Sequence, residues 1–233
     1  MKQPTLQLLL AARRETRPAV LVTEMESGGQ TLISEGAPEG DVKLTPALRE
    51  AVEKARRDDR SGVAEIDGKS FFIHVLQPPL RLIVVGAVHI AQSLAPMAAL
   101  AGYAVTIVDP RRSFATDERF PDLAVRNDWP DEAMAELRPD GRTAIVTLTH
   151  DPKIDDPALD CALRSPAFYI AALGSRKTHA GRLERLREMG HDAHALDRIH
   201  GPAGLSLGAV SPAEIAVSIL AQMTGVLRNG AAA

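Results

Sequence analysis

Hydrophobic and polar positions follow two different regimes along the chain, and the change falls at Gln77-Pro78-Pro79. Neither proline can donate to a strand ladder, and neither is tolerated inside a helix, so the pair marks a boundary. We therefore expect a small N-terminal α/β domain at residues 1–77 and a larger domain at residues 80–230.

The N-terminal segment mixes helical and strand spacing. Leu48, Val52 and Ala55 share one helical face with charges opposite. Asp67-Gly68 separates two short hydrophobic runs, which is a strong hairpin signal. Residues 31–42 show little periodicity. The pattern predicts helices at 5–14 and 44–57, and strands at 19–25, 62–66 and 70–76.

The longer segment alternates buried strands with amphipathic helices. Ser211-Pro212-Ala213-Glu214 has the form of a capping box and opens the last helix. This alternation predicts an α/β fold: a Rossmann-like parallel sheet with helices on both faces. If the strand order is 3-2-1-4-5, the loop after the fourth strand lies beside the loop after the first. The predicted strands are 81–85, 104–108, 123–126, 143–148 and 167–173, and the helices before the last are 90–101, 131–137, 157–163 and 176–189.

Composition narrows the class of protein. The chain is 45% hydrophobic and 24% charged with a net charge of −3, so we expect no nucleic-acid partner. Its single cysteine excludes a disulfide framework and a cysteine-rich zinc site. No apolar run reaches the roughly 18 residues that span a bilayer, and the N-terminal charges follow the apolar stretch, unlike a signal peptide. We expect a cytoplasmic protein that does not enter a membrane.

In an open parallel sheet, ligands bind beyond the carboxyl ends of the strands. After the first of these strands comes Gly86-Ala87-Val88-His89, at the position of a dinucleotide fingerprint. Only the first glycine of that fingerprint is present, because Val88 and Ala91 fill the other two places. The segment is either a modified phosphate or nucleotide site or a plain strand–helix turn.

The second strand is followed by Asp109-Pro110-Arg111. Asp109 lies 23 residues beyond Gly86, about where an acidic residue meets a ribose hydroxyl in a dinucleotide fold. The alternative is that Asp109 caps the turn and the arginine is solvated.

The fourth strand is followed by Thr149-His150-Asp151-Pro152-Lys153. His150 could act as a general base or a ligand, and Lys153 could hold an anion. Alternatively, the segment is a helix start whose acids favour the helix dipole. A metal on His150, Asp151 and Asp155 matches no strong template, so we expect no metal site.

The fifth strand is followed by Gly174-Ser175-Arg176-Lys177. A glycine, a hydroxyl and two cations at a helix N-terminus make an anion cradle. The alternative is Ser175 as a simple N-cap with exposed cations. We favour the anion site, because cations at a helix N-terminus oppose the dipole and a bound anion would relieve that.

As a set, these loops resemble one family. The segments that carry the resemblance are residues 86–91, 109–111, 114–121, 149–153, 169–178 and 211–219. Together they resemble the Rossmann-like domain of the XdhC/CoxI family over roughly residues 80–225. That family comprises accessory proteins of xanthine dehydrogenase and carbon monoxide dehydrogenase.

The resemblance implies a molybdenum-cofactor chaperone without catalytic residues of its own. Such a protein binds molybdopterin or its dinucleotide transiently, supports its sulfuration by a sulfurtransferase, and delivers it to a xanthine dehydrogenase-type molybdenum hydroxylase. The implied cofactor-binding residues are Gly86, Ala87, Val88, His89, Asp109, Arg111, His150, Asp151, Lys153, Gly174, Ser175, Arg176 and Lys177.

The chain departs from the family at two places. The family's N-terminal domain usually carries Gly-Gly-Gly-Cys, whereas residues 28–42 hold Gly28-Gly29 and no cysteine. A separate N-terminal-domain paralogue would supply that cysteine. Ala171 replaces a glycine common in relatives. By analogy we also expect a homodimer.

Two other functions stay open. An NAD(P)-dependent oxidoreductase would use the same sheet edge, but the missing glycine and the lack of a clear hydride-transfer constellation count against it. A ligand-free regulatory subunit would explain the missing N-terminal cysteine.

Overall fold

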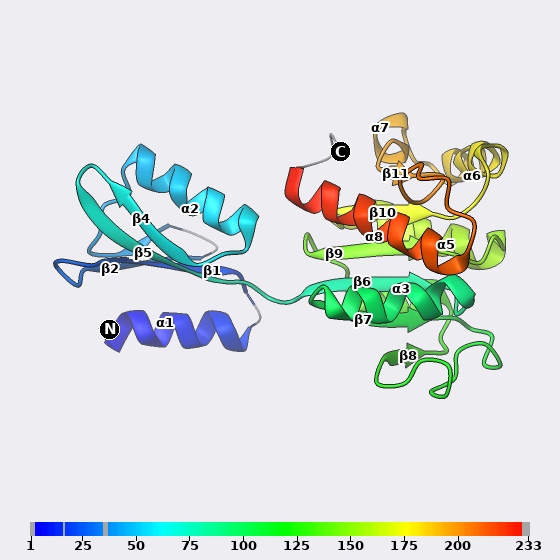
Figure 1. The fold of residues 1–233 in the computed structure, drawn as a ribbon, viewed down its shortest axis with the longest axis horizontal. Helices are drawn as coiled ribbons and strands as arrows, with labels where there is room; N and C mark the ends of the chain where they lie inside the picture. The colour runs from blue at the N-terminus through cyan, green and yellow to red at the C-terminus, as the bar shows by residue number, and fades with distance from the viewer. Residues whose placement is uncertain (1–2, 16, 35–36, 230–233) are drawn as a thin grey trace. The chain divides into compact units, whose positions relative to one another are not determined.

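The structure, a computed structural model, describes residues 3–15, 17–34 and 37–229. The chain divides into two compact units, residues 1–78 and 79–233. Each unit is a layered α/β structure with its own sheet (Figure 1).

The first unit is an antiparallel sheet with one helix on each face (Figure 1). Its strands lie in the order β3-β2-β1-β5-β4. Asp67 and Gly68 both have positive φ, 52° and 76°, as the predicted two-residue hairpin between β4 and β5 requires. The elements are α1 (Gln3–Arg14), β1 (Ala19–Glu24), β2 (Gln30–Ile33), β3 (Glu39–Gly40), α2 (Pro46–Asp58), β4 (Gly62–Ile66) and β5 (Lys69–Leu76).

Alternation along β1 explains the two helix layers. Val20 and Val22 pack with Leu48 and Val52 of α2, whereas Leu21 packs on the opposite face with residues of α1. The run 19–22 is buried throughout because both faces are covered.

The second unit is a parallel sheet of six strands in the order β11-β10-β9-β6-β7-β8. In the numbering of the predicted strands this is the order 3-2-1-4-5, with a two-residue sixth strand added beside the fifth. Its elements are β6 (Leu80–Val85), α3 (His89–Leu100), β7 (Tyr103–Val108), β8 (Ala124–Arg126), α4 (Pro130–Leu137), β9 (Thr143–Thr147), α5 (Pro152–Arg164), β10 (Tyr169–Ala172), α6 (Arg176–Glu188), α7 (Ala193–Leu196), β11 (Ile199–His200) and α8 (Pro212–Asn229).

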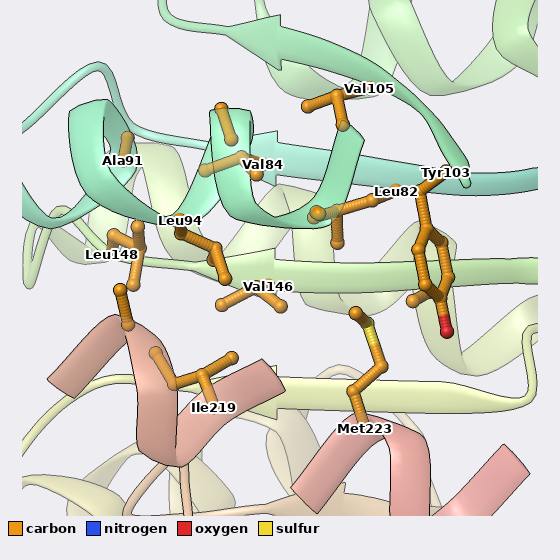
Figure 2. Close-up of a cluster of buried hydrophobic side chains, with 14 of the residues drawn as sticks. Leu82, Val84, Ala91, Leu94, Tyr103, Val105, Val146, Leu148, Ile219 and Met223 are labelled. Carbon is orange, nitrogen blue, oxygen red and sulfur yellow. The ribbon is translucent and has the colours of Figure 1, made fainter. Parts of the chain in front are cut away.

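Helices cover both faces of this sheet, so the α/β fold class is confirmed. Leu82 and Val84 of β6 point to a core shared with α3 and α8, which Figure 2 shows closing around Leu94, Ile219 and Met223. The alternate β6 residues belong to a second core on the other face, formed with α4, α5 and α6. Two covered faces explain why the strands are hydrophobic at every position.

One stretch without a pattern in the sequence forms strands, and two local expectations are confirmed. The stretch without periodicity, 31–42, holds β3 and all but the first residue of β2, and strands of two and four residues are too short to show a pattern. Residues 157–163 lie on a helix as predicted, and this helix, α5, begins at Pro152 with Asp151 as its cap. The capping box is confirmed: the Ser211 N–H donates to Glu214 Oε2 (2.8 Å) and the Glu214 N–H donates to Ser211 Oγ (3.2 Å).

Within the described residues, no helix combines the length and the apolar character needed to cross a bilayer.

Candidate functional site

Four loops begin side by side at the carboxyl edge of the parallel sheet. They follow β7, β6, β9 and β10, which are consecutive neighbours in the sheet. Backbone hydrogen bonds join each loop to the adjacent strand: Gly86 N–H to the Val108 carbonyl (2.9 Å), Leu148 N–H to the Val85 carbonyl (2.8 Å), and Leu173 N–H to the Thr147 carbonyl (2.9 Å). Segments up to 87 residues apart in sequence, at Gly86 and Leu173, are therefore held in one row.

The first loop and the loop after β9 are in direct contact. Gly86 has φ of 112°, and a Cβ atom there would lie 2.6 Å from Cγ2 of Thr149. Only glycine satisfies both the backbone conformation and this close approach. The one glycine of the dinucleotide fingerprint that this chain retains thus positions two loops against each other.

Asp109 is fully buried and its carboxylate is saturated by hydrogen bonds from the protein. Oδ2 accepts from the N–H of Ala87 (2.8 Å) and from Nη2 of Arg111 (2.7 Å). Oδ1 accepts from the backbone N–H (3.0 Å) and Nε (2.9 Å) of Arg111. Burial acts to raise the pKa of Asp109, but these hydrogen bonds outweigh it and the pKa is lowered. Asp109 therefore orients the first loop instead of presenting a free carboxylate.

Arg119 fixes the first loop from its other side. Its Nη1 donates to the carbonyls of Ala87 (2.8 Å) and Phe114 (2.6 Å), and Nη2 donates to Oε1 of Gln92 (3.0 Å). Arg111 lies over the ring of Phe114, 4.5 Å from its centroid. Both backbone polar groups of Ala87 are thus engaged by the segment that follows β7. Sequence reasoning missed Arg119, although it lies inside the 114–121 segment.

The loop after β9 presents His150 and buries Asp155. His150 is exposed and has a positive φ of 62°. Asp155 accepts hydrogen bonds from Oγ1 of Thr149 (2.6 Å) and from the N–H of His150 (3.0 Å). Burial raises the pKa of Asp155 despite these bonds. Since α5 begins at Pro152, Asp155 lies in its first turn, and its hydrogen bonds fix the loop that precedes the helix.

Helix starts at this edge differ in how their N–H groups are capped. Asp151 caps α5 by accepting from the N–H of Lys153 (3.0 Å), and Ser175 caps α6 by accepting from the N–H of Thr178 (3.1 Å). Val88 holds the same position before α3 and offers no side-chain acceptor. Among the described loops of this row, the start of α3 therefore keeps backbone donors without a side-chain cap.

The predicted site residues fall into two groups. Gly86, Ala87 and Asp109 are buried and shape the loops. Five polar side chains are exposed on helix starts or on the loop just before one: His89, His150, Lys153, Arg176 and Lys177. Gly174, Ser175, Asp151, Val88 and Arg111 lie between them on the same three helix starts and the loop after β7.

Arg182 on the predicted helix 176–189 is buried, which the charged sequence of that helix does not indicate. Arg182 is only 2% exposed, and Arg185 binds Asp156 through Nε (2.5 Å) and Nη2 (3.0 Å). The spacing of Arg182 to Leu186, one helical turn, is the one signal that places it on the buried face. In the described part of the chain, no three His, Cys, Asp or Glu side chains gather in a group that could hold a metal ion.

Comparison with known proteins agrees with this architecture. Residues 82–223 match the family model described as the XdhC Rossmann domain. A solved structure described as a xanthine dehydrogenase from Bacillus halodurans superimposes with a TM-score of 0.73 at 23% identity, covering 97% of this chain and 67% of that one. At that identity the likeness speaks to the fold.

The curated relatives that match in sequence include two with descriptive names. One is the "Molybdenum cofactor insertion chaperone PaoD" of Escherichia coli, 32% identical over 150 residues, or 64% of this chain and 41% of the relative. The other, from Bacillus subtilis, is described as a probable xanthine dehydrogenase subunit and is 31% identical over 155 residues, or 66% of this chain and 45% of the relative. The matched part is thus less than half the length of either relative.

Proposed function

The chain belongs to the XdhC family, whose Rossmann domain it carries at residues 82–223, and from that premise we propose that it is a carrier of the molybdenum cofactor. In this proposal it binds molybdopterin or its dinucleotide and hands it to a xanthine dehydrogenase-type molybdenum hydroxylase. The proposal places this exchange in the cytoplasm.

One observation supports the proposal above the others: four neighbouring strands deliver their loops to one sheet edge that is rich in exposed cations. Arg176 and Lys177 stand on the first turn of α6, and Lys153 stands on the first turn of α5. The cargo is a pterin that carries a phosphate and is therefore anionic. Charge-assisted hydrogen bonds from such side chains are the strongest that a surface can offer it.

The polar groups of these loops also suit the pterin part of the cargo. His89 and His150 are exposed on the same edge and can donate or accept hydrogen bonds to a pterin ring. The uncapped start of α3 adds backbone donors next to them. Asp109 and Arg119 hold the loop that carries these donors, so we assign them a positioning role.

The cargo supplies the molybdenum and its dithiolene sulfurs, and this chain's residues bind and orient it. The single cysteine, Cys161, is half-buried on α5, and burial raises the pKa of its thiol. A thiolate for the metal or for sulfur transfer would therefore come from a partner: a sulfurtransferase, or a paralogue with the N-terminal cysteine. We assign the first unit, residues 1–78, to the family's N-terminal domain.

A binding titration tests the proposal. Purified protein is titrated with molybdopterin, and the double variant Arg176→Ala/Lys177→Ala is compared with Arg187→Ala, which removes an exposed cation at the far end of the same helix. We expect the double variant to bind about tenfold more weakly, and Arg187→Ala to bind like the parent. Equal affinity in all three proteins contradicts the proposed cation contacts.

Transfer and cofactor choice are tested separately. The loaded protein should restore activity to a cofactor-free molybdenum hydroxylase, and the double variant should restore less at equal concentration. NADH fluorescence should not change on mixing. Quenching of NADH with turnover of a substrate would instead support the oxidoreductase alternative.

A further inference from the structure

A small cavity lies between the starts of α5 and α6, beside the exposed edge described above. Its volume is about 250 Å³. Its lining includes His150 and Asp155 from the β9 side and Lys177, Thr178, Gly181 and Arg182 from α6. Sites for whole small molecules are roughly 300–1,000 Å³, so this cavity suits a single charged group.

Arg182 is the unusual residue in this lining. Its side chain is 2% exposed. Nη2 donates to the carbonyl of Leu173 (2.8 Å), whereas Nε and Nη1 are buried and have no hydrogen-bond partner among the described residues. A buried cation with two unused donors is destabilising unless something pairs with it.

The nearest carboxylate forms an ion pair with Arg182 but accepts no hydrogen bond from it. Oδ2 of Asp155 lies 3.8 Å from Nη2 of Arg182, beyond hydrogen-bond distance. Asp155 is committed to Thr149 and His150 instead, through the bonds described above. The guanidinium thus keeps two donor nitrogens, Nε and Nη1, for which the described residues supply no acceptor.

The rest of the lining favours an anion. Lys177 and Thr178 belong to the first turn of α6, a 13-residue helix whose dipole is positive at this end. Arg185 also lines the cavity, with Asp156 as its partner. Among the described lining residues, Arg185 is paired with Asp156, which leaves one carboxylate, Asp155, for two cations, Lys177 and Arg182.

We propose that this cavity binds an oxyanion of phosphate size, with Arg182 as its central ligand and Lys177 at its mouth. The same chemistry serves free phosphate and the phosphate group of a larger ligand. The assignment to the phosphate of the carried pterin rests on the proposed function, whereas phosphate binding itself does not.

Two variants test the cavity by different means. Arg182→Met removes the charge and keeps the length of the buried stem. Gly181→Glu leaves Arg182 in place and puts a carboxylate into the cavity. A Cβ at Gly181 would meet only Nη1 of Arg185, at 3.7 Å, so the helix accepts a side chain there. Arg187→Met is the matched control, because Arg187 is exposed on the same helix and outside the lining.

The first arm titrates the protein with inorganic phosphate at constant ionic strength set by chloride, followed by amide NMR shifts. We expect the shifts to cluster on residues 150–155 and 174–185, and both variants to bind phosphate at least tenfold more weakly, with Arg187→Met unchanged. Parent protein that does not distinguish phosphate from chloride overturns the inference. So does Gly181→Glu protein that binds phosphate like the parent, even if Arg182→Met does not fold.

The second arm titrates the same proteins with molybdopterin and with a pterin that lacks phosphate. Weaker binding of molybdopterin, but not of the phosphate-free pterin, in both variants assigns the cavity to the cargo's phosphate. Phosphate binding without any molybdopterin binding keeps the cavity site and contradicts the proposed function. Molybdopterin binding that neither variant weakens keeps the proposed function and contradicts the assignment.

Discussion

The carboxylate of Asp109 accepts a hydrogen bond from the backbone N–H of Ala87 at 2.8 Å, and this bond joins the loop after β7 to the loop after β6. In a dinucleotide-binding fold an acidic residue at this place faces the ligand's ribose. Here all four acceptor positions of the carboxylate are filled by Ala87 and Arg111. An acidic residue therefore stands at the usual position, but it binds Ala87 and Arg111 of the protein instead of a ribose.

Asp109→Asn should therefore lower stability. The amide keeps the shape, but it removes the charge and places N–H donors against those of Arg111. Because Arg111 is a third exposed and can be hydrated, we expect a loss of about 2 kcal/mol in the free energy of unfolding, measured by urea at pH 7. Asp117→Asn, an exposed change on the following loop, should stay within about 0.5 kcal/mol.

The stability difference between Asp109→Asn and the parent should depend on pH. The folded-state pKa of Asp109 is lowered, so its contribution is present above the unfolded pKa of about 3.9 and is lost as pH falls through the folded value. The stability difference between Asp109→Asn and the parent should shrink in that acid range. A difference that stays constant down to pH 3 would contradict the role assigned to the carboxylate.

Gly86→Ala tests the contact between the first loop and Thr149. Gly102→Ala is the reference, because Gly102 also has positive φ (90°) but nothing lies within 4 Å of its missing Cβ. Backbone strain should lower the free energy of unfolding of the Gly102→Ala reference by about 1–3 kcal/mol. Gly86→Ala should lower it further, because its new Cβ would lie 2.6 Å from Cγ2 of Thr149.

A double-mutant cycle isolates the clash. Thr149→Ser removes Cγ2 and keeps the hydroxyl that donates to Asp155 (2.6 Å). In this background Gly86→Ala should cost less, by about 1 kcal/mol in the free energy of unfolding. If the cost is the same in both backgrounds, the two loops do not touch as described.

Much of this architecture follows from the hydrophobic pattern, and the exceptions have physical causes. The parallel strands are buried on both faces, so uninterrupted apolar runs such as 82–85 predict them directly. β3 and β11 have two residues each and are set by pairing with a neighbouring strand, which a local pattern does not record. The start of α5 does not follow from sequence, because Asp151-Pro152 fits a turn and a helix cap equally well.

The site divides in the same way. Sequence reasoning could place the loops at one sheet edge, because strand order and parallel pairing fix where each strand ends. The sequence does not distinguish exposed side chains of these loops from buried ones that form hydrogen bonds within the protein. Asp109 and Arg182 look like surface charges in sequence, and only tertiary contacts decide that both are buried.

Arg119→Met should loosen the segment that follows β7. The substitution keeps an apolar stem against Phe114 and Phe120 and removes the hydrogen bonds to Ala87, Phe114 and Gln92. We expect amide hydrogen exchange in residues 112–120 to become about tenfold faster. Arg112→Met, an exposed neighbour, should leave the exchange rates unchanged. Equal protection in both variants would mean that Arg119 does not anchor this segment.

Acid should destabilise the second unit through two histidines. Burial lowers the pKa of His179, with the charge of Arg182 adding to it, and burial lowers the pKa of His200. His179 packs so closely on Gly201 that a Cβ there would lie 2.1 Å from its Nδ1, and His200 stacks on Tyr169 with ring centroids 4.9 Å apart. Burial in these contacts disfavours the protonated form of both rings.

The sign follows from proton linkage. Above the unfolded pKa of about 6.5 both rings are neutral in the folded and unfolded states, and stability does not depend on them. As pH falls from there toward the lowered folded-state pKa values, the unfolded chain binds more protons than the folded chain. The free energy of unfolding therefore decreases by up to about 1.4 kcal/mol per pH unit for each histidine. His200→Phe keeps the stack on Tyr169 and removes the titration of that ring. His179→Met keeps an apolar side chain beside Gly201 and likewise removes the titration of the half-buried His179. Urea unfolding at pH 7.5, 6.0 and 5.0 should therefore show a shallower acid loss in each variant than in the parent. His194→Gln, an exposed change, should leave the slope as it is. A parent-like slope in both His179→Met and His200→Phe would show that other groups cause the acid loss.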